Sequence, residues 1–185
     1  LSMILSIDDT DSRELGMCTT YVGTMVANVL SEHGGDINQI YLIRLNPAAK
    51  HKTRGNAAVA IEFTGVSEET AFDIATRITD SNARVDDPET NPAVLCTTED
   101  TVQDPSFQEF TQKTIHELVS IEEATQIISE HNISSWYGGN GRGRIGALAA
   151  LGAKHTFDDW TYECISYRSP DTWGSDREFN TESIK

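Results

Sequence analysis

The chain has 185 residues, of which 38% are hydrophobic and 8% aromatic, which is enough to bury a core of its own. It carries 29 acidic against 14 basic residues, for a net charge of −15. Because no apolar run approaches the ~20 residues that span a membrane and no signal-peptide pattern opens the chain, we expect a soluble, cytoplasmic protein without membrane partners. The three cysteines are widely spaced and form no CxxC pair, and their odd number argues against a disulfide framework.

The acidic residues are spread along the whole chain, and only five of the basic residues are lysines. An acidic surface repels the phosphates of a nucleic acid in dilute salt. Few lysines with dispersed acids are typical of a halophilic protein, whose salt-saturated cytoplasm screens charges beyond a few ångströms. Net charge therefore says little about the partners of this protein.

Hydrophobic periodicity predicts strands and helices in alternation from the N-terminus. The first half is expected to contain a strand over 3–7, an acidic cluster over 8–12, a helix over 19–33, a strand over 40–45, a polar loop over 46–56, a strand over 57–63 and a helix that begins at Ser67.

The second half begins with a polar loop over 80–92. It should continue with a strand over 93–96 and a helix from Asp104-Pro105 that carries Phe107, Phe110, Ile115 and Leu118. A second helix follows, with a capping box of Ser120 and Glu123. The rest is expected to form a strand over 133–137, a glycine-rich run over 138–143, a small-residue helix over 145–153 and a strand over 162–167. Strands that alternate with helices predict an α/β domain with a mixed sheet and flanking helices.

The first candidate site is Asp8-Asp9-Thr10-Asp11, where an apolar strand ends. Clustered carboxylates repel one another unless a cation lies between them, and Mg²⁺ is held by one or two such oxygens together with substrate phosphates. A solvated turn with an aspartate helix cap explains the same residues without any ligand.

The second candidate is the loop over 50–56, where three of the 14 basic residues, Lys50, Lys52 and Arg54, fall within five positions. Concentrated positive charge on an acidic chain is typical of phosphate binding. Ion pairing to neighbouring acids is the alternative.

The third candidate is the glycine run over 138–144. Glycines let backbone N–H groups approach a phosphate at the start of the helix that follows. A P-loop is excluded because Arg144-Ile145 stands where Lys-Ser/Thr is required. A dinucleotide-binding fold needs more alternating structure than the rest of the chain supplies, and a structural glycine turn remains possible. Together, the acids, the bases and the glycines predict a nucleotide–Mg²⁺ site built from three distant segments.

Several blocks resemble the archaeal isoleucine-tRNA 2-agmatinylcytidine synthetase family. They are spread in order over nearly the whole chain, at residues 7–12, 16–21, 44–47, 52–56, 141–143, 145–150, 162–165 and 167–168. The resemblance implies an unusual kinase-like domain that uses ATP and Mg²⁺. In this family, C2 of the anticodon wobble cytidine of an isoleucine tRNA with a CAU anticodon is activated by phosphorylation, ATP is consumed to AMP and pyrophosphate, and agmatine displaces the activating phosphate.

The resemblance also implies roles for individual residues. Asp8, Asp9 and Asp11 would hold Mg²⁺ or act as a base; Thr19 would be a phosphorylatable threonine; Lys52, Arg54, Gly55 and Asn56 would bind phosphates; Gly139, Asn140, Gly141, Arg142 and Gly143 would contribute to the nucleotide pocket.

The family continues into a ferredoxin-like domain, an OB-fold and a zinc ribbon. We expect residues 1–185 to be a single kinase-like catalytic domain without these three, a fragment that binds tRNA weakly by itself. Two other functions stay open. One is a non-catalytic nucleotide-binding or tRNA-docking module. The other is an aspartyl phosphotransferase of haloacid dehalogenase type that uses Asp9-Thr10-Asp11, although Arg13 stands where that family has Thr or Val.

Overall fold

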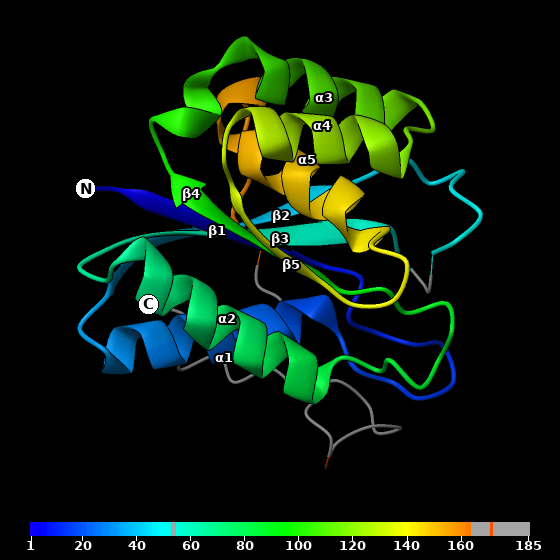
Figure 1. The fold of residues 1–185 in the computed structure, drawn as a ribbon, viewed down its shortest axis with the longest axis horizontal. Coiled ribbons are helices and arrows are strands. Elements are labelled where there is room, and N and C mark those ends of the chain that lie inside the picture. Colours follow the sequence, from blue (N-terminus) through cyan, green and yellow to red (C-terminus); the bar gives the residue numbers. More distant parts are fainter. Residues whose placement is uncertain (53–54, 164–170, 172–185) are drawn as a thin grey trace.

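The computed structural model describes residues 1–52, 55–163 and 171, and in this part of the chain a single sheet is covered by helices on both faces (Figure 1). The described strands are β1 (Met3–Asp8), β2 (Asp36–Arg44), β3 (Ala57–Thr64), β4 (Ala93–Thr98) and β5 (Ser134–Tyr137). They form a sheet of order β2-β3-β1-β4-β5, in which every pairing is antiparallel. The α/β class with flanking helices is thus confirmed, but the expected mixed sheet is wrong, because β3 and β4 both run opposite to the central strand β1 and the two edge strands are antiparallel to their neighbours.

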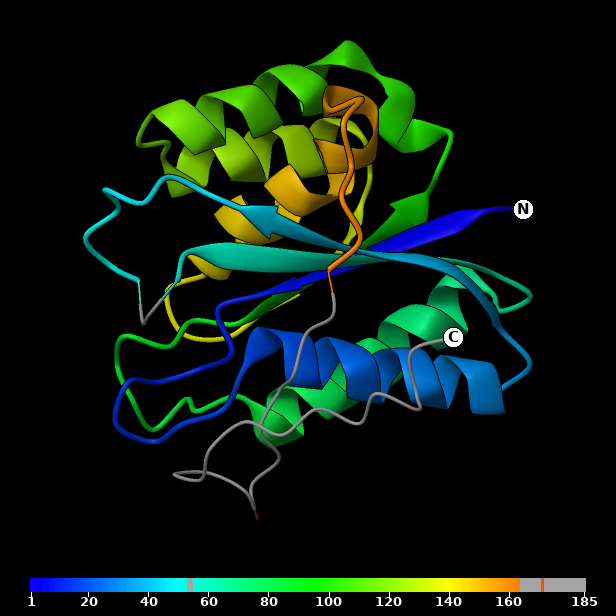
Figure 2. The same cartoon turned by 180° about the vertical axis from the view of Figure 1, so that it is seen from behind.

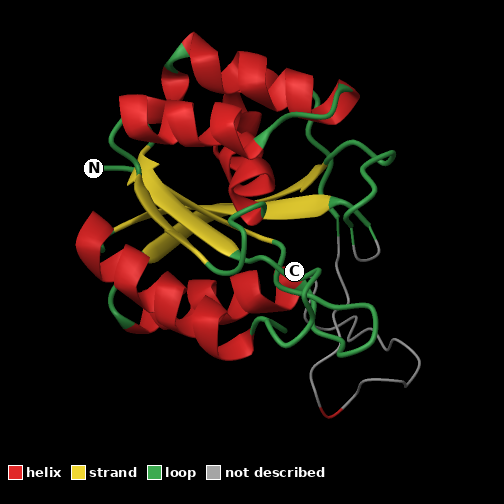
Figure 3. Cartoon of the chain, turned by 45° about the vertical axis from the view of Figure 1, so that its right-hand side comes forward, coloured by secondary structure: helices red, strands yellow, loops and turns green. Residues whose placement is uncertain are grey.

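Two layers of helices enclose the sheet, as Figure 3 shows from the side. The helices are α1 (Thr19–Glu32), α2 (Glu68–Asn82), α3 (Pro105–His116), α4 (Ile121–Glu130) and α5 (Gly143–Thr156), with a 3₁₀ turn, η1 (Thr101–Gln103), before α3. Helices α1 and α2 cover one face of the sheet, and α3, α4 and α5 cover the other.

The strands send alternate side chains into two cores, as the period of two along a strand requires. On the α1–α2 face the side chains are large and include Leu5, Ile61 and Phe63. On the other face β3 and β4 present small residues, including Ala58 and Ala93, to α5. Because α5 is itself rich in Gly and Ala, its backbone can lie close to the sheet.

Three of the expected helix starts are confirmed by their caps. Ser67 caps α2, Asp104 caps α3 with Pro105 at its first position, and Ser120 forms the full capping box of α4 with Glu123. Leu118 was expected in the third helix, but α3 ends at His116 because the backbone at Glu117 is extended.

The last expected strand, 162–167, lies mostly outside the described residues. Its first two residues, Tyr162 and Glu163, are not in a strand. No helix in the described part of the chain is both long and apolar enough to cross a membrane.

The loops that follow β1, β2, α2 and β5 gather at one end of the sheet, which is the left-hand end in Figure 2. These loops contain the acidic cluster, the basic loop and the glycine run. The fold therefore brings the three candidate segments to one place.

Candidate functional site

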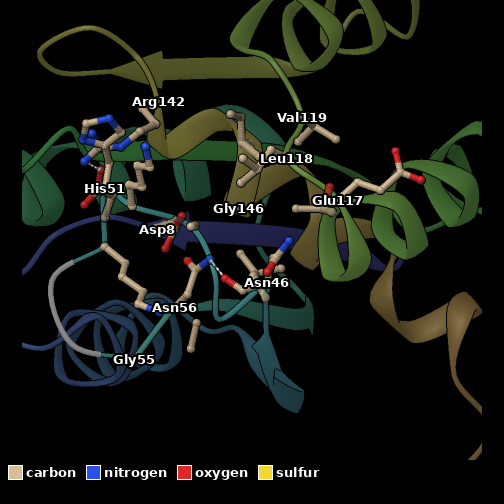
Figure 4. A pocket seen from close by; sticks show the side chains of 18 of the residues that line it. Asp8, Asn46, His51, Gly55, Asn56, Glu117, Leu118, Val119, Arg142 and Gly146 are labelled. Carbon is tan, nitrogen blue, oxygen red and sulfur yellow. Dashed lines mark hydrogen bonds and ion pairs between the residues drawn. The ribbon is translucent and has the colours of Figure 1, made fainter.

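A cavity of about 390 Å³ opens at this end of the sheet (Figure 4). Acidic, basic and apolar side chains from distant parts of the chain share its wall. The lining residues are Asp8, Asp9, Asp11, Leu45, Asn46, Ala49, Lys50, His51, Lys52, Gly55, Asn56, Ala57, Thr114, Glu117, Leu118, Val119, Arg142, Ile145 and Gly146.

Asp8, the last residue of β1, lies between the start of α5 and the loop that carries Asn56 (Figure 4). Burial raises the pKa of the Asp8 carboxyl well above its usual range, and the negative charges of Asp9 and Asp11 raise it further. The backbone N–H of Asp9 and the charge of Arg142 oppose this rise. Asp8 is therefore a carboxyl group that holds a proton more tightly than an ordinary aspartate does.

Asp9 turns the chain sharply, with a left-handed φ of 59°. Its Oδ2 accepts a hydrogen bond of 3.1 Å from Arg142 Nη2 and one of 3.2 Å from the backbone N–H of Asn91. Burial raises the pKa of Asp9 to about 6, although the charge of Arg142 lowers it. The pair of Asp9 and Arg142 thus joins the acidic loop to the glycine run.

The basic loop contributes Lys50, His51 and Lys52 to the wall, followed by Gly55 and Asn56. Asn56 holds the loop closed, because its Nδ2 donates to the carbonyl of Asn46 at 2.9 Å. Arg54, the other cation that was expected to bind phosphate, lies outside the described residues.

Of the glycine run, Arg142 lines the pocket, and Ile145 and Gly146 of the helix that follows also line it; Gly139, Asn140, Gly141 and Gly143 do not. The backbone N–H groups of residues 140–145 each donate a hydrogen bond within the protein. Two of the acceptors belong to Asn91, whose Oδ1 accepts from Asn140 and whose carbonyl accepts from Gly143. In this conformation the run is a tightly bonded turn, and its amides are not presented to a phosphate.

Gly146 makes room for Asp8. A Cβ at this position would lie 2.0 Å from Asp8 Oδ2 and 2.9 Å from Leu45 Cδ1. Helix α5 can therefore pass directly over the acidic residue only because Gly146 has no side chain.

Thr19 begins α1 as expected, but Cys18 precedes it as the capping residue. The Thr19 side chain is buried, and its Oγ1 lies 3.0 Å from Oγ1 of the buried Thr10. Thr19 does not line the pocket. Its hydroxyl contacts the acidic loop from outside the cavity, so its assignment as a phosphate acceptor stays a prediction.

No group of three or more His, Cys, Asp and Glu side chains among the described residues is arranged to hold a metal ion. Because Mg²⁺ takes one or two carboxylates and completes its shell with water and phosphate oxygens, the donor set at Asp8 still suits it. A cation there would offset the repulsion between the three carboxylates. The magnesium site at Asp8, Asp9 and Asp11 stays a prediction.

The sequence pattern did not single out several residues of the site. Thr114, Glu117, Leu118 and Val119, at the end of α3, form part of its wall, and Asn91 ties two loops together behind it. Leu118, which lies beyond the end of α3, is exposed, with 70% of its surface accessible.

Two family models match the chain. Residues 4–139 match the TiaS TCKD domain, and residues 141–185 match the TiaS FLD domain. The chain is 43% identical to TiaS of Haloquadratum walsbyi, a 2-agmatinylcytidine synthetase named for an isoleucine tRNA, over 98% of this chain and 39% of that protein. It is 41% identical to the protein of the same name from Methanosarcina acetivorans, over 98% of this chain and 43% of that protein.

Solved structures agree with these matches. The fold superimposes on TiaS in complex with its isoleucine tRNA and ATP with a TM-score of 0.87 at 35% identity, covering 100% of this chain and 43% of that one. For a complex of TiaS with the same kind of tRNA, AMPCPP and agmatine, the TM-score is 0.80 at 31% identity, over 100% and 44% of the two chains.

The fold and the pocket thus define an α/β domain of the kind found in an archaeal family of tRNA-modifying enzymes. The chain belongs to the TiaS family. It spans about two fifths of the length of the curated relatives it matches. The expectation of one domain over all 185 residues stays a prediction, because residues 141–185 match a second model.

Proposed function

We propose that this chain is the ATP-handling part of an enzyme that ligates agmatine to the wobble cytidine of an isoleucine tRNA with a CAU anticodon. ATP is consumed to AMP and pyrophosphate while C2 of the cytidine is activated by phosphorylation. One observation carries the proposal: Asp8, Lys52 and Arg142, from three distant segments, line a single cavity. The names of the relatives and of the solved complexes support the same reaction.

The cavity offers the groups that binding of a nucleoside triphosphate requires. Lys50, Lys52 and Arg142 supply positive charge for phosphates, and Asp8 with Asp11 supplies oxygen ligands for Mg²⁺. Leu45, Leu118, Val119 and Ile145 form an apolar wall against which a base can lie. When bound, Mg²⁺ would neutralise charge that develops on the phosphates.

The first test is ligand binding. Millimolar ATP–Mg²⁺ in high salt should raise the melting temperature of the protein, because a ligand that binds only the folded form stabilises it. The rise should shrink in Arg142→Ala and remain in Arg77→Ala, since Arg77 lies on the surface of α2, where it pairs with Asp73. An unchanged melting curve in the unsubstituted protein would contradict the nucleotide site.

The second test separates an enzyme from a docking module. The full-length protein should form AMP and pyrophosphate from ATP when tRNA and agmatine are present, whereas a non-catalytic module would bind these ligands without consuming ATP. The aspartyl phosphotransferase is disfavoured because Asp9, its nucleophile, is held by Arg142 and by the Asn91 amide.

Thr19 is the proposed phosphate acceptor within the protein. Because its hydroxyl lies against Thr10 and not in the cavity, transfer to it requires the acidic loop to rearrange. Intact-mass measurement after incubation with ATP–Mg²⁺ should show one phosphate on the unsubstituted protein and on Thr19→Ser, and none on Thr19→Val. A phosphate on Thr19→Val, mapped to another residue, would remove the assignment.

A further inference from the structure

An exposed aromatic ring and an arginine form a stack beside the pocket. Tyr137 ends the edge strand β5, and 47% of its surface is accessible. The guanidinium carbon of Arg144 lies over this ring, 4.0 Å from its centroid. Arg144 Nε also donates to the carbonyl of Gly141 at 3.1 Å, which fixes the orientation of the guanidinium group.

The glycine run is shaped around this stack. Gly141 has a φ of 77°, and a Cβ on it would lie 2.6 Å from Arg144 Nη2 and 2.9 Å from Tyr137 Cδ2. Any side chain at this position would push the two groups apart. The run that was expected to cradle phosphates therefore holds a flat, cationic surface in place.

Further exposed side chains lie on the adjoining loops. Val85 and Leu15 are 50% and 43% exposed, and a Cβ on Gly138 would lie 3.9 Å from Val85 Cγ1. Arg84 Nε donates to the Leu15 carbonyl at 3.2 Å, which joins the two loops. We call Leu15, Arg84, Val85, Tyr137 and Arg144 the Tyr137 patch.

Two of the carboxylates of the neighbouring loop are already engaged. Asp87 accepts from the Ser12 hydroxyl, and Glu89 lies 3.1 Å from His51 and 3.6 Å from Arg142. The patch and the pocket both include residues from the start of α5, because Arg142 lines the pocket and Arg144 belongs to the patch.

We propose that the Tyr137 patch binds an unpaired base of RNA by stacking, next to the nucleotide that is modified. This inference rests on the proposed function and names the surface that receives the tRNA. Exposed aromatic rings and guanidinium planes bind the faces of unpaired bases without regard to sequence. Stacking is the contact that suits a chain of net charge −15, because charge attraction to phosphates weakens steeply as salt rises.

The test uses the full-length enzyme in high salt. Tyr137→Trp should keep the stack and gain a fluorophore, and unmodified isoleucine tRNA should quench it. ATP without tRNA should not. Ile40→Trp is the matched control, since Ile40 is a 43% exposed residue on the opposite edge strand, β2. The response of the unsubstituted protein is subtracted, because the chain has three tryptophans of its own.

Kinetics supply the second measurement. Tyr137→Ala should raise the KM for tRNA roughly 5- to 100-fold, the range expected for one lost base stack, and leave the KM for ATP unchanged. Tyr137→Phe should behave like the unsubstituted enzyme. Arg144→Lys, which keeps the charge and loses the plane, should weaken tRNA binding.

Three results would overturn the proposal: an unchanged KM for tRNA in Tyr137→Ala, equal quenching of Tyr137→Trp and Ile40→Trp, or an equal rise in the KM values for tRNA and ATP. The last result would mean that the stack only supports the fold. If Tyr137→Ala does not fold, the fluorescence quenching of Tyr137→Trp and Ile40→Trp still tests the proposal. Failure of the unsubstituted enzyme to bind tRNA would instead contradict the proposed function.

Discussion

The acidic loop buries two carboxyl groups close to a third, and burial is the main reason that their pKa values rise. The pKa of Asp9 is about 6 in the folded protein, above its usual 3.8, and that of Asp8 is also raised. A carboxyl group whose pKa rises on folding stabilises the folded state below its unfolded pKa and loses this effect as the pH rises through its folded pKa. Without a bound cation, both groups therefore make the fold less stable at pH 7 than at pH 4.

Asp8→Asn should consequently stabilise the protein while it impairs the site. Removing the buried carboxylate should raise the free energy of unfolding at pH 7, because burial and the charges of Asp9 and Asp11 disfavour the ionised form of Asp8 in the folded protein. The gain should shrink towards pH 4, where Asp8 is protonated in the folded state and partly protonated in the unfolded state. The change in the free energy of unfolding is measured by denaturant melts at pH 4 and pH 7, in high salt with a chelator present.

Asp80→Asn is the control, since it removes the same charge from an exposed position on α2. It should change stability by less than about 0.5 kcal/mol at either pH. An equal gain in the two variants would show that net charge, and not the acidic loop, sets the effect. A loss of stability in Asp8→Asn would contradict the cost of burying a charged carboxylate at this position.

Asn91 is a buried residue that links the acidic loop to the glycine run through one amide and two oxygens. Asn91→Ala removes the acceptor of the Asn140 N–H and should cost about 1–3 kcal/mol. Because the same turn positions Arg142, the affinity for ATP–Mg²⁺ should fall as well. Calorimetric titration measures this affinity.

Asn82→Ala supplies the comparison for Asn91→Ala. Its side chain also donates one hydrogen bond, to Ile78 at 2.8 Å, but it lies at the end of α2. Asn82→Ala should lose some stability and keep its affinity for ATP. Equal loss of affinity in both variants would mean that Asn91 acts only through the overall fold.

Asn91 also shows what a sequence cannot reveal about a site. Asp8, Asp9 and Lys52 could be proposed because clustered charge is visible in a linear pattern, and Arg142 because it stands in a glycine-rich run that resembles the family; the structure does bring them to one cavity. An asparagine in a polar loop has no such signature. Its role comes from partners 82 and 49 positions away, which only the folded chain brings near.

Among the helices, α5 lies closest to the chemistry of the site. Gly146→Ala raises the intrinsic helix preference by about 1 kcal/mol, yet its Cβ must displace Asp8 or Leu45. The variant should fold and bind ATP–Mg²⁺ at least roughly tenfold more weakly. Calorimetric titration measures this affinity.

Gly23→Ala in α1 is the control substitution for Gly146→Ala, because it also places an alanine inside a helix. The nearest atom to its new Cβ would be Val59 Cγ1, at 3.0 Å, on the other face of the sheet. It should shift stability slightly and leave ATP binding intact. Full ATP affinity in Gly146→Ala would show that Asp8 does not need its place beneath α5.

Most element boundaries could be predicted because caps and breakers are local. The capping box at Ser120 and Pro105 at the start of α3 are signals within four residues. The order of the strands in the sheet could not be predicted from the sequence. The position of β1 between β3 and β4 depends on how helices pack on both faces of the sheet, which no local signal encodes. Leu118 fits the periodicity of α3, yet the extended backbone at Glu117 ends the helix before it.

For the molecule as a whole, the dispersed negative charge should make stability depend on salt. A net charge of −15 on one compact chain repels itself, and the screening length grows from ~3 Å at 1 M salt to ~10 Å at 0.1 M. The melting temperature should therefore fall by several degrees between 2 M and 0.1 M KCl, as followed by circular dichroism. NaCl should protect as well as KCl if screening is the cause, and equal stability at both concentrations would remove the halophilic interpretation.

Helix α5 belongs to one part of the chain by its family match and to the other part by its packing. It falls within the part of the chain that matches the FLD model, yet it fills the core on one face of the sheet built by the TCKD part. A cut after Asn140 would remove the helix that packs directly on that face beneath α3 and α4, so the boundary between the two family matches does not separate two independently stable parts. The helix is also a rigid rod of about 21 Å. Near one end Gly146 touches Asp8, and near the other Lys154 pairs with Glu62 and Glu99. Helix α5 thus links the ion pairs of Lys154 with Glu62 and Glu99 at one end to the position of Asp8 at the other.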